Sequence, residues 1–98
     1  MGSKMETKQI KVTVKADEAV LKGVYSNNLM IARTGEEFIL DFINLVPPQA
    51  FVTSRIIVSP MHMKRIVKAM SESLSKYEEM HGEIKDVPPQ ITPEALKQ

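Results

Sequence analysis

The sequence EFILDFINLV, residues 37–46, is followed by two prolines and then, after Gln49 and Ala50, by FVTSRIIV, residues 51–58. Apolar residues occupy both alternating sets of the first stretch, which is typical of a strand covered on both faces. Pro47 and Pro48 lack the amide hydrogen that a strand ladder uses, so they end this strand. The two stretches therefore predict the centre of an antiparallel sheet, both faces of which need a covering.

A hairpin around the prolines sets Asp41 opposite Arg55, and Ile39 opposite Ile57. Asp41 and Arg55 are the only charged residues within residues 38–46 and 51–58. Because opposite charges that face each other across two strands satisfy one another, we expect a structural ion pair. A second turn around Gly35 would place Ile31 opposite Ile39, on the same face as Asp41.

Further elements extend outward from this hairpin. Residues 7–15 alternate apolar Ile10, Val12 and Val14 with polar residues, and predict a half-buried strand. Residues 24–33 predict another strand. Ser59 and Pro60 are a favoured N-cap and first helical residue, and Gly82 follows the last periodic residue of the helix that they begin.

The predicted helix has about 22 residues and a length of roughly 33 Å. A strand of about six residues spans only roughly 20 Å, so the helix should extend beyond the sheet. Leu74, Tyr77 and Met80 lie in this distal half and therefore need another surface to pack on.

These patterns predict an α+β fold with a four-stranded antiparallel sheet, in β-β-β-β-α order, and one long C-terminal helix. Residues 7–82 would form this single domain. Residues 1–6 would be a disordered leader, and residues 83–98 a proline-rich tail that is extended or disordered.

A single helix covers one face of the sheet, which we expect to be the face of Phe38, Leu40 and Phe42. The other face would then present four isoleucines, at Ile31, Ile39, Ile43 and Ile57. Because exposed apolar faces of this size usually mark interfaces, we predict a homo-oligomer, a dimer or tetramer. The second sheet face or the distal helix residues would form the contact. The alternative is that the tail and residues 16–22 fold over this face.

Composition excludes several classes of function. The chain has 98 residues, 13 Lys and Arg, 12 Asp and Glu, and no cysteine. It therefore has no disulfide and no thiolate metal site. No stretch has the roughly 20 apolar residues of a membrane span, and the near-neutral charge gives little reason to expect nucleic-acid or membrane binding. The histidines His62 and His81 lie roughly 28 Å apart on the helix, so we expect no metal site. The glycines are scattered and form no phosphate-binding loop, so we expect no cofactor.

No catalytic residue is predicted, because the serines and glutamates lack partners at useful positions. Polar groups for an enzyme site would have to come from Tyr25, Asn27, Asp41 and Arg55.

Three basic residues, Lys64, Arg65 and Lys68, gather near the helix start and form a candidate patch for phosphate or an acidic partner. The sequence favours the simpler explanation of a solvated helix face with Lys68–Glu72 and Glu72–Lys76 pairs. The acidic far end of the helix would also complement the basic end in an oligomer.

Several runs together resemble the bacterial domain-of-unknown-function family 3467. They are Gly23-Val24-Tyr25-Ser26-Asn27, Glu36 to Phe42, Ser54 to Pro60 with Lys64-Arg65, Tyr77-Glu78, and Gly82-Glu83-Ile84. The resemblance covers about Ile10 to Ile84. It implies a bacterial, cytoplasmic protein with no assigned activity, and it suggests a transcription-associated role. The order of strands and helix is also similar to that of the export chaperone SecB, although a second long helix and a strongly acidic surface are lacking.

We therefore expect a non-catalytic, oligomeric protein-interaction module, with a chaperone-like function as one form of it. Its partners would be itself and another protein. The alternative is a transcription-associated accessory protein that binds RNA polymerase or nucleic acid through Lys64, Arg65 and Lys68.

Overall fold

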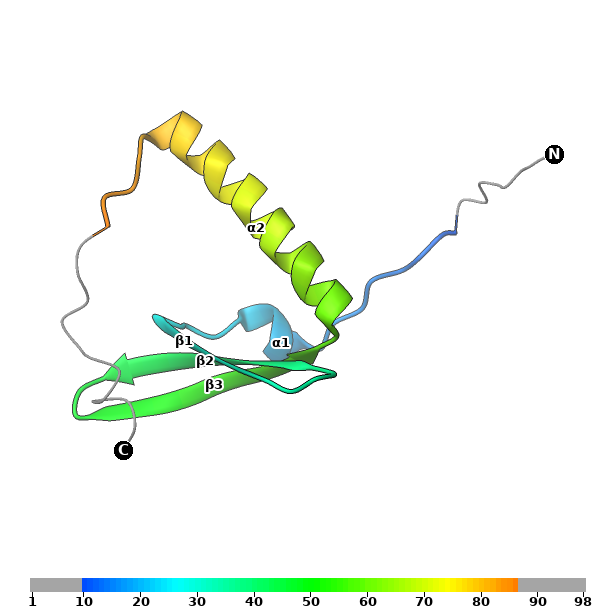
Figure 1. Ribbon diagram of the computed structural model, residues 1–98, viewed down its shortest axis with the longest axis horizontal. Helices are drawn as coiled ribbons and strands as arrows, with labels where there is room; N and C mark the ends of the chain where they lie inside the picture. Colours follow the sequence, from blue (N-terminus) through cyan, green and yellow to red (C-terminus); the bar gives the residue numbers. More distant parts are fainter. Residues whose placement is uncertain (1–9, 87–98) are drawn as a thin grey trace.

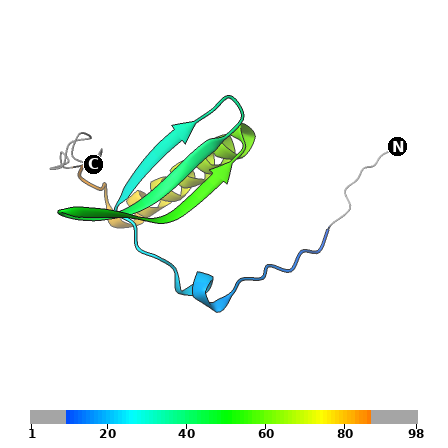
Figure 2. The same ribbon diagram turned by 90° about the horizontal axis from the view of Figure 1, so that it is seen from below.

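The computed structural model describes residues 10–86 and consists of a three-stranded sheet with one long helix (Figure 1). The elements are α1 (Glu18–Lys22), β1 (Asn28–Arg33), β2 (Phe38–Val46), β3 (Gln49–Val58) and α2 (Pro60–His81). The strands are antiparallel in the order β1-β2-β3. Helix α2 begins beside the end of β3 and rises away from the sheet along its length. Figure 2 shows the opposite sheet face, with α2 behind it.

The expected sheet of four strands is wrong, because three strands form it within residues 10–86. Residues 10–15 of the predicted first strand belong to no strand, and residues 7–9 lie outside the described part of the chain. The side chains of Ile10, Val12 and Val14 are 74–89% exposed. Alternation predicts how a segment would sit in a sheet, but a strand also needs a neighbour to receive its hydrogen bonds.

The register of β2 and β3 is confirmed around the ion pair. Asp41 lies opposite Arg55, and Ile39 opposite Ile57. The ladder shifts between Phe42 and Ile43, where Thr53 is the extra residue of a β-bulge, and its hydroxyl donates to the Phe42 carbonyl at 2.9 Å. The hairpin closes around Pro47 and Pro48, which a cis peptide bond joins.

The register of β1 differs by one residue from the prediction. Ile31 lies opposite Leu40 and not Ile39, so it belongs to the Leu40 face and not to the Asp41 face. The cause is Thr34, whose amide donates to the Glu37 carbonyl at 2.9 Å and whose hydroxyl accepts from the amides of Glu36 and Glu37. These bonds centre the turn between Gly35 and Glu36, whereas the sequence pattern predicts a turn centred on Gly35 itself.

The predicted ends of the long helix are confirmed. The Ser59 hydroxyl accepts a hydrogen bond from the His62 amide at 3.1 Å, and Pro60 is the first helical residue. Gly82 follows the last turn with a φ of 91°, a left-handed value that suits glycine.

Very little of the chain is buried. Among the described residues, Leu40, Ile43 and Val58 are the buried apolar side chains, and no polar residue is buried. Because burial of apolar side chains is the main source of folding stability, these residues give the single chain only a small stabilisation. A search of the described helices finds none that is both long and apolar enough to cross a membrane.

Candidate interaction surface

Residues 10–86 leave the apolar stripe of α2 largely exposed. Met63 and Ile66, in the first turns, are half-buried, and no residue of α2 is fully buried within the described structure. Five apolar side chains of α2 beyond Ile66 are each at least half exposed: Val67, Met70, Leu74, Tyr77 and Met80. This gradient follows the divergence of helix and sheet in Figure 1. We call these five residues the α2 stripe.

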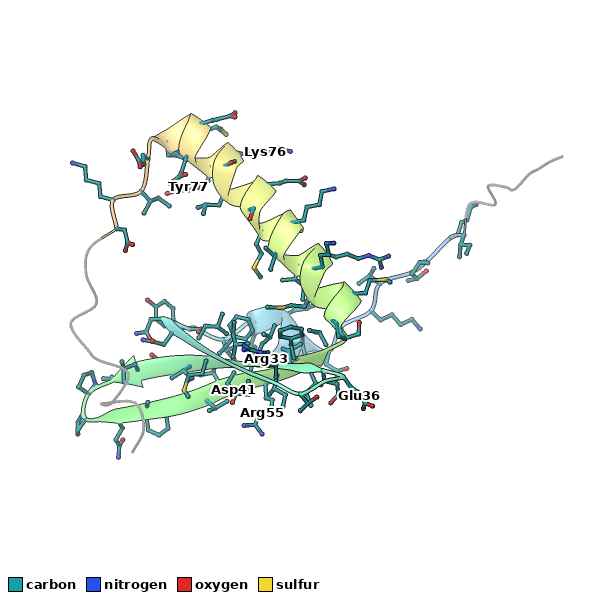
Figure 3. The ribbon with its side chains drawn as sticks, in the orientation of Figure 1. Arg33, Glu36, Asp41, Arg55, Lys76 and Tyr77 are labelled. Carbon is teal, nitrogen blue, oxygen red and sulfur yellow. The ribbon has the colours of Figure 1, made fainter. Side chains whose placement is uncertain are left out.

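The chain after Gly82 turns back and lies against the distal part of the α2 stripe. The Ile84 amide donates to a side-chain oxygen of Glu78 at 3.0 Å. Met70, Ser73, Leu74, Tyr77 and Ile84 then line a shallow, mostly apolar hollow. The Tyr77 and His81 rings stack at a tilt, with centroids 4.6 Å apart. Figure 3 shows Tyr77 on the side of α2 toward the sheet and Lys76 on the outer side.

The sheet face toward α2 is also only partly covered. Leu40 and Val58 are buried there and Phe38 and Phe42 are half-buried, but Ile31 and Ile56 are exposed. The α2 stripe and the sheet face therefore present two apolar surfaces inclined to each other. Sequence reasoning assigned this face to the helix alone, because a 3.6-residue period shows which side of a helix is apolar but not where the helix axis points.

The opposite sheet face carries the Asp41–Arg55 ion pair (Figure 3). Arg55 donates from Nε to one Asp41 oxygen at 2.8 Å and from Nη2 to the other at 2.9 Å. The Asp41 side chain is 17% exposed, whereas that of Arg55 is 61% exposed. The predicted pair is therefore present as a bidentate contact.

The contact shifts the titration of both groups. Hydrogen bonding from Arg55, assisted by its charge, holds the pKa of Asp41 below the ordinary value of 3.8, although partial loss of hydration acts in the other direction. The same hydrogen bonds and the Asp41 charge raise the pKa of Arg55. Both groups therefore stay ionised at neutral pH, and each is the hydrogen-bond partner of the other.

The four residues that an enzyme site would need do not offer converging groups. The Asn27 amide nitrogen donates to the Leu45 carbonyl at 3.1 Å, and its oxygen accepts from the Leu45 amide at 2.8 Å. These bonds extend the β1–β2 ladder. Asp41 and Arg55 bind each other, and Tyr25 is exposed. Each polar group except Tyr25 thus has a structural partner.

The predicted interface residues have different surroundings. Ile31, Ile57, Leu74, Tyr77 and Met80 are exposed, Ile39 is half-buried, and Ile43 is buried at 4% exposure. Ile43 therefore has little surface left for a partner. Leu29, Met30 and Ile56 are exposed sheet residues that we did not predict as interface. Ile84 was also missed, because the return of the chain after Gly82 leaves no periodic pattern.

Charge is divided along α2. The basic residues Lys64, Arg65 and Lys68 are exposed near its start, and the first turn contains no acidic residue. Glu72, Glu78 and Glu79 lie in the second half of the helix, with Glu83 and Asp86 in the segment after it. No group of three or more metal-binding side chains occurs in residues 10–86.

A family model described as "Protein of unknown function (DUF3467)" matches residues 1–86. The chain belongs to the DUF3467 family. This family assignment confirms the resemblance seen in the sequence. Comparison with curated proteins finds no match. Comparison with solved structures finds none either, so the similarity to SecB stays a prediction.

Proposed function

We propose that this DUF3467 protein is a non-catalytic interaction module that works as a homo-oligomer. The observation that carries the proposal is the α2 stripe, five apolar side chains at least half exposed on one side of one helix. Contiguous apolar surface of this kind usually marks a protein interface. Methionine suits such a surface because its flexible side chain adapts to a partner, and the stripe contains Met70 and Met80.

The charges of α2 favour a second copy as the partner. A two-fold axis near Ser71 would pair two α2 helices antiparallel, with Lys64 of one copy beside Glu78 of the other. Like charges would then be kept apart and opposite charges brought together at both ends of the contact. In the chaperone-like form of the proposal, the protein also binds segments of unfolded proteins. These segments would contact the apolar sheet residues that the helix contact leaves exposed.

Two substitutions with the same charge change test this proposal. Leu74→Glu places a carboxylate in the α2 stripe, whereas Ser75→Glu places one on the neighbouring position, about 100° around the helix and outside the stripe. We expect Leu74→Glu to weaken self-association at least about tenfold, and Ser75→Glu to leave it nearly unchanged. Sedimentation equilibrium measures both, and circular dichroism confirms that both variants keep their helix. Equal effects of the two substitutions would contradict a contact through the stripe.

A transcription-associated role is the second candidate, and the exposed cluster of Lys64, Arg65 and Lys68 supports it. Binding to nucleic acid through these residues should weaken as salt rises, because each phosphate contact releases counterions. Charge reversal at the three positions should then abolish binding to duplex DNA, RNA or RNA polymerase in a pull-down assay. If the reversed variant binds as well as the wild type does, this candidate is wrong.

A further inference from the structure

The segment Ile10–Lys15 has the composition of a strand but lacks a neighbour. Its apolar side chains Ile10, Val12 and Val14 are highly exposed and alternate with Lys11, Thr13 and Lys15. Three of the six residues are valine or isoleucine, and β-branched side chains favour strands. The segment extends away from the sheet in Figures 1 and 2. We call it the N-terminal arm.

The sheet has an unoccupied edge of matching character. β3 pairs with β2 on one side, and no described residue pairs with its other side. β3 is ten residues long and contains neither proline nor lysine, two residues that commonly protect edge strands. The bulge at Thr53 interrupts it, which leaves the regular run Ser54–Val58. This run is about as long as the arm.

The path of the chain brings the arm to the β3 side of the sheet. Residues 23–27 lead from α1 to β1, yet Ala19, Val20, Gly23 and Val24 share a shallow hollow with Thr53 and Ser54 of β3. Figure 2 shows α1 beyond β3, on the side away from β1, with the arm continuing outward from it. The arm is therefore presented on the side of the molecule where the β3 edge lies open.

We propose that the N-terminal arm of one copy adds as a fourth strand to the β3 edge of a second copy. In the single chain the arm lies away from its own β3 (Figure 2), although no residue from 10 to 86 pairs with that edge, so another chain is the partner that the structure favours. Reciprocal exchange uses two arms and two edges and closes around a two-fold axis. The added strand would shield Ile10, Val12 and Val14 and would cover the β3 edge.

This inference rests on the proposed homo-oligomer and adds the contact that the arm would make within it. The arm would run antiparallel to Ser54–Val58 and leave Lys11 and Lys15 on its solvent side. The lysines would then discourage further strand addition, because the arm becomes the new edge of the sheet. Association would stop at a closed assembly.

Isotope-filtered NMR tests the exchange directly. In a mixture of ¹³C-labelled and unlabelled protein, filtered spectra show contacts between different chains alone. We expect such contacts between the methyl groups of Val12 or Val14 and residues 54–58. The inference is overturned if residues 10–15 contact β3 only within one chain, or contact no strand.

Two neighbouring proline substitutions supply an independent measurement. Successive amides of an edge strand point alternately toward its neighbour and toward solvent, so only one of Val12→Pro and Thr13→Pro should remove a hydrogen bond to β3. We expect one variant to weaken self-association by about tenfold, and the other to change it much less. Equal effects would contradict a paired strand. Wild-type protein that is monomeric would overturn the oligomer itself, whereas an oligomer in which neither proline has an effect would overturn only the exchange.

Discussion

At the residue scale, the Asp41–Arg55 pair could be predicted because two lone charges stood in apolar strands. Its bidentate geometry fixes which residues of β2 and β3 face each other. A one-residue slip would place each charge opposite an apolar or neutral residue and turn one strand over. Because Arg55 is well exposed, we expect the pair to contribute little to stability and mainly to fix the register of β2 and β3.

The pair gives the fold a pH dependence with a definite sign. The pKa of Asp41 is lower in the folded chain than the ordinary 3.8, because Arg55 hydrogen-bonds to the carboxylate. The ionised pair therefore stabilises the fold above that ordinary value, and its contribution disappears as pH falls through the lowered pKa. Melting temperatures between pH 6 and pH 2 should fall more steeply for the wild type than for Asp41→Asn. Parallel curves would show that the pair does not couple to folding.

Two glycines form a matched pair for a conformational prediction. Gly82 has a φ of 91°, whereas Gly35 does not have a positive φ, and nothing would obstruct a Cβ atom within 4 Å at either position. We expect Gly82→Ala to lower the free energy of unfolding by about 1–2 kcal/mol, because a side chain strains a backbone with this positive φ. Gly35→Ala should not destabilise the fold in this way. Urea unfolding measures the difference, and equal losses would contradict it.

At the scale of the elements, local signals predicted α2 and the β2–β3 hairpin well. Ser59, Pro60 and Gly82 act within a few residues of themselves, so the ends of α2 could be predicted from sequence. The position of Ile31 could not, because the hydroxyl of Thr34 shifts the centre of the turn. The prediction of a strand at residues 7–15 failed for a different reason. Its alternating pattern was clear, but strand pairing depends on a neighbour far away in the sequence or in another chain.

The N-cap of α2 gives an element-scale prediction. Ser59→Ala removes the acceptor for the His62 amide and should destabilise the fold by about 1 kcal/mol. Ser75→Ala is the control, because alanine raises helix propensity at an exposed position of the same helix that lies outside the α2 stripe. Thermal unfolding followed by circular dichroism at 222 nm measures both. A Ser75→Ala variant that loses as much stability as Ser59→Ala would contradict the capping role.

At the scale of the whole molecule, the exposed α2 stripe and the unpaired β3 edge have one property in common: the described residues of a single chain cover neither of them. A chain with three buried apolar side chains in its described part gains little from folding alone, and a second copy, as proposed, would supply further contacts. The sequence does not separate interface residues from core residues, because both are apolar and follow the same period. Ile43, which the sequence placed in the interface, is buried within the chain itself.

A charge swap tests the antiparallel helix contact at this scale. Lys64→Glu should weaken self-association by about two- to tenfold, because it places like charges at both ends of the contact. Adding Glu78→Lys to the same chain should restore part of the loss, even though it also removes the acceptor of the Ile84 amide. Association constants from sedimentation velocity make the comparison. Additive losses in the double variant would contradict the pairing of these two residues.

The most direct test of the central claim is the molar mass of the wild-type protein in solution, measured by light scattering over a range of concentrations. One chain has a mass of 11.0 kDa. A second copy that covers the α2 stripe predicts at least twice this value, falling toward the value for one chain upon dilution. A mass of 11.0 kDa at every concentration, for protein that is folded by circular dichroism, would contradict it.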